Sequence, residues 1–104
     1  MNNCKDLNEV RENIDRIDNQ IVKLIAERSY YVKQAVNFKK TTDDVKAPKR
    51  VELIIEKVRK LAEDNNVNPN IIEVVYRNMI NSFINLELEE YNKKIGRSQN
   101  EWFR

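Results

Sequence analysis

The sequence contains no histidine, only one cysteine and only one glycine. Without histidine, Ser-His-Asp and Cys-His catalysis and the usual zinc sites are excluded. Cys4 has no second cysteine with which to form an internal disulfide, which is typical of a cytoplasmic protein. A single glycine and two prolines in 104 residues favour long helices over a turn-rich β protein. Any chemistry must therefore use arginine, lysine, carboxylates and shape.

Long apolar runs and a dominant charge of one sign are also missing. No apolar segment is long enough for a transmembrane helix, and the first residues lack the apolar core of a secretory signal. The 19 basic and 17 acidic residues are interleaved and give a net charge of +2, which argues against nucleic-acid binding by bulk charge. We expect one cytoplasmic domain, small enough that burial in an oligomer is plausible.

The N-terminal third has the pattern of one long helix. Asp6 and Glu9 are spaced as an N-cap and the third helical residue of a capping box. Apolar residues then recur at intervals of three and four, which predicts a helix over residues 6–40; they are Leu7, Val10, Ile14, Ile17, Ile21, Leu24, Tyr31, Ala35 and Phe38. Such a helix is roughly 50 Å long, whereas a globule of this size is roughly 26 Å across. Its far end must pack on something else, most simply a second copy of the chain.

Two further helices are predicted after a polar loop at residues 41–44. Pro48 fits the first turn of a helix whose apolar face repeats with helical spacing up to Ala62. Asn65 and Asn66 are expected to end that helix. Asn68 and Pro69 then form an N-cap followed by proline at the first helical position. The expected fold class is therefore all-α, with three helices per chain, one of them long.

The third helix is expected to stop at Gly96, the sole glycine. Residues 1–95 then form one helical domain. Residues 96–104, which include Trp102 and Phe103, form a frayed or loosely docked tail to which we assign no function.

Charged residues stand where the apolar stripe of the first helix should continue. Arg28 interrupts the stripe, and Lys39 follows eleven residues later, which on one helix is three turns plus about 20° and roughly 16 Å. Val32 and Ala35 lie between them, so both cations could reach a dianion over the small alanine. Arg11 precedes Arg28 by seventeen residues, roughly 25 Å and about 100° around the helix. If both arginines serve one small ligand, Arg11 must come from another subunit.

Two more charged residues are candidates for the functional site. Glu87 lies among Ile80, Phe83 and other apolar residues of the third helix, a setting that favours the protonated carboxyl group. Arg50 lies in the first turn of the second helix. Each charge also has a plain structural interpretation: Arg28 could extend to solvent from a coiled-coil seam, and the others could belong to solvated faces.

Taken together, the segments 10–18 and 24–28, followed by Lys39 after a further helical stretch, resemble the all-helical type II chorismate mutase family. The resemblance runs from about Leu7 to Tyr91, most of the chain. It implies an entwined dimer of three-helix chains with two equivalent active sites and no metal or cofactor. Arg28, Lys39 and Arg50 would come from one subunit and Arg11 from the other.

Within that family, the segments 14–18, 31–35, 38–39 and 47–51 are most similar to the bacterial isochorismate pyruvate lyases. Typical chorismate mutases hold the C4 hydroxyl of the substrate with an Asp and a Glu near the start of the second helix, and the matching residues here are Ala47 and Val51. This departure favours isochorismate over chorismate. A second departure is Glu87, which stands where most members carry glutamine and which can donate a hydrogen bond only when protonated.

The resemblance implies a pericyclic enzyme that converts isochorismate to salicylate and pyruvate, with chorismate mutase side activity. Chorismate mutase or 4-amino-4-deoxychorismate mutase as the main activity, and a non-enzymatic helical interaction module, are the alternatives. The implied substrate is a small dicarboxylate held by the arginines, and neither nucleic acid nor membrane is expected as a partner. Lys39 and Glu87 would face the breaking ether bond, while the apolar lining of the site would be Val32, Ala35, Ile80 and Phe83.

Overall fold

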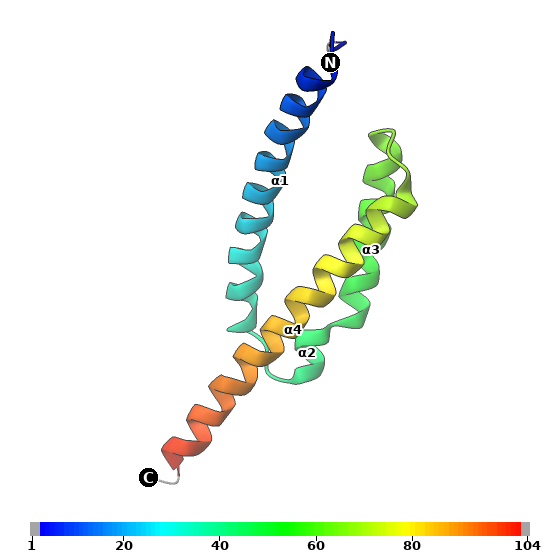
Figure 1. The fold of residues 1–104 in the computed structure, drawn as a ribbon. Helices are drawn as coiled ribbons and strands as arrows, with labels where there is room; N and C mark the ends of the chain where they lie inside the picture. Colours follow the sequence, from blue (N-terminus) through cyan, green and yellow to red (C-terminus); the bar gives the residue numbers. More distant parts are fainter. Residues whose placement is uncertain (1–2, 103–104) are drawn as a thin grey trace. The chain divides into compact units, whose positions relative to one another are not determined.

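The computed structural model describes residues 3–102, with side chains described for residues 3–93. In this range the chain is helical throughout apart from short connections, and no strand occurs. The expected all-α class is therefore confirmed, with three long helices and one short addition. The helices are α1 (Leu7–Val36), α2 (Thr42–Lys46), α3 (Pro48–Asp64) and α4 (Pro69–Trp102) (Figure 1). The chain divides into two units between Gln34 and Ala35.

The start of α1 is fixed by Asp6, as the sequence predicts. Asp6 Oδ1 accepts a hydrogen bond of 2.8 Å from the backbone N–H of Glu9, which would otherwise lack a partner inside the helix. The reciprocal half of the capping box differs from the expected one, because Glu9 Oε2 accepts from the N–H of Lys5 at 3.4 Å. The cap thus extends one residue further toward the N-terminus.

The predicted apolar stripe of α1 is exposed in the single chain. Leu7 is 59% exposed, Ile14 50% and Leu24 64%, and the stripe residues between them are similarly open. Apolar side chains in such a regular row are expected to be buried, because each contributes about 1.5–3 kcal/mol when removed from water. The stripe is therefore a contiguous apolar surface of the kind that marks an interaction site.

The expectation that the first helix continues to residue 40 is wrong, because α1 ends at Val36. The N–H groups of Phe38 and Lys39 bond three residues back, to the carbonyl oxygens of Ala35 and Val36 at 3.0 and 3.1 Å. This tighter spacing is common in the last turn of a helix. The next N–H, that of Lys40, bonds to the Asp44 carboxylate at 3.1 Å. Local partners outside the helix thus replace the helical ones.

The prediction that residues 41–44 form a loop is wrong, because Thr41 is the N-cap of α2 and residues 42–44 are its first helical residues. Thr41 Oγ1 accepts from the N–H of Asp44 at 3.1 Å, and Asp44 Oδ2 accepts from the N–H of Thr41 at 3.1 Å. This reciprocal capping box nucleates the short helix. Ala47 ends α2 in the left-handed region with φ 37° and ψ 61°, a strained conformation for a residue with a Cβ.

Helices α3 and α4 begin where the sequence predicts. Pro48 occupies the first turn of α3, and the side-chain oxygen of Asn68 accepts from the N–H of Asn70 at 2.9 Å at the start of α4. The connection after Asp64 turns through Asn66, which adopts a positive φ of 59°. α3 and α4 pack side by side as a helical hairpin, and α2 contacts α4. The buried apolar side chains of this unit are Val36, Val45, Ile55, Val58, Ala62, Ile80 and Tyr91.

An ion-pair network on the surface joins α3 to α4. The guanidinium of Arg77 donates to both carboxylate oxygens of Glu52 at 2.9 and 3.0 Å and to Glu73 at 2.8 Å. Arg59 donates to the other oxygen of Glu73 at 2.8 Å. Glu52 and Arg59 belong to α3, whereas Glu73 and Arg77 belong to α4. The bidentate geometry fixes the register of the hairpin.

The expectation that Gly96 stops the last helix is wrong, because α4 continues to Trp102. A single glycine inside a helix costs only about 1 kcal/mol relative to alanine, so it does not end a helix by itself. Residues 96–102 of the expected tail are therefore helical. Phe103 lies outside the described residues. Within the described part of the chain, no helix combines the length and apolar character needed to cross a membrane.

Candidate active site

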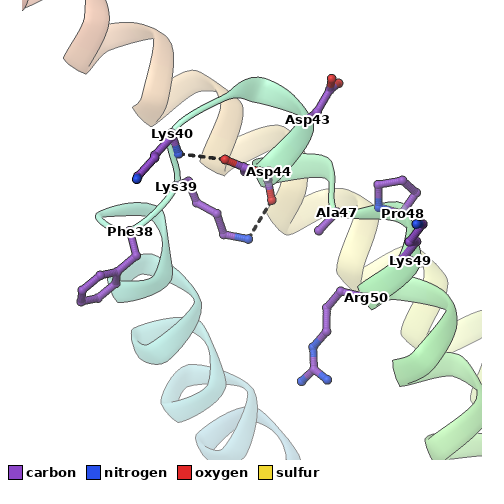
Figure 2. Close-up of a pocket in the computed structure, with 9 residues that line it drawn as sticks. All are labelled: Phe38, Lys39, Lys40, Asp43, Asp44, Ala47, Pro48, Lys49 and Arg50. Atoms are coloured by element: carbon purple, nitrogen blue, oxygen red, sulfur yellow. Dashed lines mark hydrogen bonds between the residues drawn. The ribbon is translucent and has the colours of Figure 1, made fainter.

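An open pocket of about 600 Å³ lies between the end of α1 and the start of α3 within the second unit (Figure 2). Four of its residues carry a positive charge and two carry a negative charge. Lys39 and Arg50, both predicted site residues, line it together. The lining residues are Phe38, Lys39, Lys40, Asp43, Asp44, Ala47, Pro48, Lys49 and Arg50.

Lys39 lies in the linker between α1 and α2, half-buried, with its ammonium group directed at the next helix (Figure 2). Its Nζ donates a hydrogen bond of 2.8 Å to the carbonyl oxygen of Asp44. An ammonium group has three donors, so two remain for a ligand. The linker therefore presents a cation with a defined position.

Asp44 organises this linker through its carboxylate. Its Oδ2 atom accepts from the N–H groups of Lys40 and Thr41, each at 3.1 Å. The N–H of Lys40, then that of Thr41 and the charge of Lys39, lower the pKa of the Asp44 carboxyl below its ordinary value of 3.8. Asp44 is therefore an anion near neutrality that holds the two peptide N–H groups on either side of Lys40.

Arg50 is exposed in the first turn of α3, and its neighbours Ala47 and Val51 carry no carboxylate. Ala47 lines the pocket, and Val51 is half-buried one turn later, with its N–H bonded to the Ala47 carbonyl at 3.0 Å. This end of the pocket consequently offers a guanidinium beside apolar side chains.

Glu87 is buried on α4, 9% exposed, as its position among apolar residues predicts. Ile80 on the same helix is 5% exposed, and Phe83 is half-buried. Tyr91, one turn beyond Glu87, is also buried and donates from its hydroxyl to the carbonyl oxygen of Lys40 at 2.6 Å. α4 thus carries both the buried carboxyl group and a direct bond to the Lys39–Lys40 linker.

The remaining predicted residues lie on α1. Arg11 is exposed, whereas Arg28 and Val32 are half-buried. Because α1 is continuous from Leu7 to Val36, Arg11 and Arg28 of one chain are roughly 25 Å apart and cannot grip one small ligand. Ala35 is half-buried in the last turn of α1.

The predicted helical face shared by Arg28 and Lys39 does not exist. α1 ends at Val36, three residues before Lys39, so the eleven-residue helical spacing does not apply. The linker geometry, and not the period of α1, determines where the Lys39 ammonium group lies.

Sequence reasoning missed Thr41, Asp44 and Tyr91. The first two had a readable signal, because a threonine followed three residues later by an acidic residue is a capping-box pattern. Tyr91 had none, since its partner is 51 residues away along the chain.

Comparison with known proteins identifies the family. The family model for chorismate mutase type II matches residues 10–88. An isochorismate pyruvate lyase from Pseudomonas aeruginosa is 31% identical over 93 residues, which are 89% of this chain and 92% of that protein. A chorismate mutase from Methanocaldococcus jannaschii is 41% identical over 66 residues, 62% of this chain and 67% of that protein. The chain is an enzyme of the type II chorismate mutase family.

Proposed function

We propose that the protein converts isochorismate to salicylate and pyruvate, with chorismate mutase as a side activity. The observation that carries this proposal is that two apolar residues, Ala47 and Val51, flank Arg50. Ala47 and Arg50 line the pocket, and Val51 follows Arg50 directly in α3. A site without acids at these positions lacks hydrogen-bond partners for a C4 hydroxyl and discriminates against chorismate. The lyase relative, which covers 89% of the chain, supports the same choice.

The two carboxylates of the substrate bind to arginines in this proposal. Arg28 and Arg11 of the partner subunit are the main clamps, because an arginine fork matches a carboxylate with two parallel hydrogen bonds. Arg50 closes the site from the start of α3. Val32, Ala35, Ile80 and Phe83 supply the apolar lining. Binding of the dianion by fixed cations selects the reactive conformer, which is the principal task of a pericyclic catalyst.

Lys39 and protonated Glu87 face the ether oxygen of the substrate. In the lyase reaction the ether C–O bond breaks while a ring hydrogen moves to the enolpyruvyl methylene carbon, giving salicylate and pyruvate. Negative charge builds on the ether oxygen as this bond breaks. Donors already in place stabilise that charge without reorganisation during the reaction. Glu87 is buried on α4, and its carboxyl group can donate a hydrogen bond to the ether oxygen only in its protonated form.

The active unit in this proposal is an intertwined homodimer. The exposed stripe of α1 and the exposed apolar residues of α4, Ile71, Val74 and Val75, are surfaces that a second copy can cover. The separation of Arg11 from Arg28 on α1 requires that a site using both take one from each subunit.

The test is a parallel assay of purified protein with isochorismate and with chorismate, from about pH 5 to about pH 8. Salicylate and pyruvate formed well above prephenate support the lyase proposal. Prephenate as the main product instead makes the protein a chorismate mutase with an unusual C4 contact, the activity of the archaeal relative. Absence of turnover with both substrates refutes both and directs the assay to 4-amino-4-deoxychorismate.

A further inference from the structure

Tyr91 joins α4 to the linker that carries Lys39. Its hydroxyl donates to the carbonyl oxygen of Lys40 at 2.6 Å, at the short end of the range for such bonds. Tyr91 itself is buried, so its ring is held by the surrounding side chains and its hydroxyl has little freedom to move. Lys40 directly follows Lys39, the cation that we place at the ether oxygen.

The other bonds around Lys39 are local. Its N–H bonds to the carbonyl oxygen of Val36 at 3.1 Å, and its Nζ donates to the carbonyl oxygen of Asp44 at 2.8 Å. The Asp44 carboxylate in turn holds the N–H of Lys40. These bonds join residues 36–44 to one another and keep the linker in shape. The hydrogen bond of Tyr91 differs from these, because it attaches the linker to α4, whose Tyr91 is 51 residues away along the chain.

The same helix carries Glu87. Glu87 and Tyr91 are four residues apart on α4, roughly 6 Å along the helix axis, and both are buried. One rigid element therefore carries the proposed carboxyl donor and determines where the linker with the second donor lies. A catalytic pair depends on such fixed separations, since a displacement of about 1 Å can cost up to about 100-fold in rate.

We propose that Tyr91 is a positioning residue whose hydroxyl holds the carbonyl group of Lys40, and with it the Lys39–Lys40 segment, against α4 and thereby sets Lys39 at its working distance from Glu87. The inference rests on the proposed function, because it takes Lys39 and Glu87 as the groups that face the breaking bond. Tyr91 does not touch the substrate in this account. Its effect on the rate passes through Lys39.

The test begins with Tyr91→Phe, which keeps the ring and removes the hydroxyl. We expect kcat to fall about tenfold with KM nearly unchanged, because a misplaced transition-state donor affects kcat. In a Lys39→Ala background the same change should have no further effect, since two residues that act through one group are not additive. A full tenfold loss in that background overturns the inference. Tyr76→Phe, also on α4 and half-buried, is the matched control and should keep wild-type kcat.

A measurement without turnover separates this inference from the proposed function. Trypsin cleaves after Lys39 and Lys40, and its rate at a folded segment follows how often that segment opens. We expect faster cleavage at these two residues in Tyr91→Phe than in the wild-type protein and in Tyr76→Phe. Equal cleavage rates overturn the anchoring role. If the wild-type protein turns over no substrate, the proposed function fails, while faster cleavage in Tyr91→Phe still supports the anchor.

Discussion

The Nζ atom of Lys39 donates a hydrogen bond of 2.8 Å to the carbonyl oxygen of Asp44, across the turn that joins α1 to α2. Asp44 in turn accepts from the N–H groups of Lys40 and Thr41. The cation proposed for catalysis is thus held by Asp44, the third helical residue of the capping box that begins α2. Bonds within the segment that joins α1 to α2 therefore hold the Lys39 ammonium group.

Lys39→Ala should lower kcat by about 100- to 1000-fold, because it removes one donor to the developing charge on the ether oxygen. Steady-state kinetics with isochorismate and with chorismate check this. Lys57→Ala, an exposed lysine on α3, is the charge-matched control and should leave kcat unchanged. Turnover of Lys39→Ala within threefold of wild type contradicts the assignment.

Glu87→Gln should flatten the pH profile of kcat. A glutamate donates only in its protonated form, so the wild-type rate should fall as pH rises, whereas a glutamine amide donates at every pH. The two proteins are compared from about pH 5 to about pH 8. Parallel profiles for wild type and variant would show that Glu87 does not donate to the substrate.

Val51→Glu should shift preference toward chorismate. The new carboxylate at the family's acidic position can accept from a C4 hydroxyl, and one such hydrogen bond corresponds to about tenfold in the ratio of the two kcat/KM values. The ratio of prephenate to salicylate formed is the measurement, with Val51→Leu as the control that fills the site without an acceptor. An unchanged ratio in Val51→Glu means that position 51 does not face the C4 group.

Arg11→Ala and Lys39→Ala should complement each other in a heterodimer. If Arg11 acts across the subunit interface, one of the two sites in that heterodimer keeps both wild-type residues, so about half of the wild-type activity returns. Each variant alone should be nearly inactive. The heterodimer is isolated through two different affinity tags and assayed. A heterodimer as inactive as its parents would place Arg11 and Lys39 of each site in the same chain.

Arg77→Gln should lower the melting temperature at neutral pH, since it breaks the pairs with Glu52 and Glu73. The hydrogen bond from Arg77 lowers the pKa of both glutamates below the ordinary value of 4.5. This stabilisation is complete above the ordinary value and is lost as the pH falls through the lowered ones. The difference in melting temperature between the wild-type protein and Arg77→Gln should therefore disappear at acidic pH. A gap that stays constant with pH excludes the ion pairs as its cause.

The starts of the helices could be predicted from the sequence because caps are local. Asp6, Pro48 and the Asn68–Pro69 pair each lie within a few residues of the groups that they stabilise, and each begins a helix as expected. The burial of Glu87 could also be predicted from the sequence, since apolar residues of α4 lie on the same face of the helix. In the Thr41–Asp44 segment, by contrast, the capping signal was local but was interpreted as a loop.

The placement of Lys39 was decided by tertiary structure. The helical period put Lys39 on the face of Arg28, yet α1 ends before it and the linker bonds to Asp44 and Tyr91 instead. The sequence by itself determined the helical class, the starts of α1, α3 and α4, and the set of charges available for catalysis, because these depend on neighbours along the chain. Only tertiary packing decided where the linker lies against α4, because the Tyr91–Lys40 bond joins groups 51 residues apart that meet only in the folded unit.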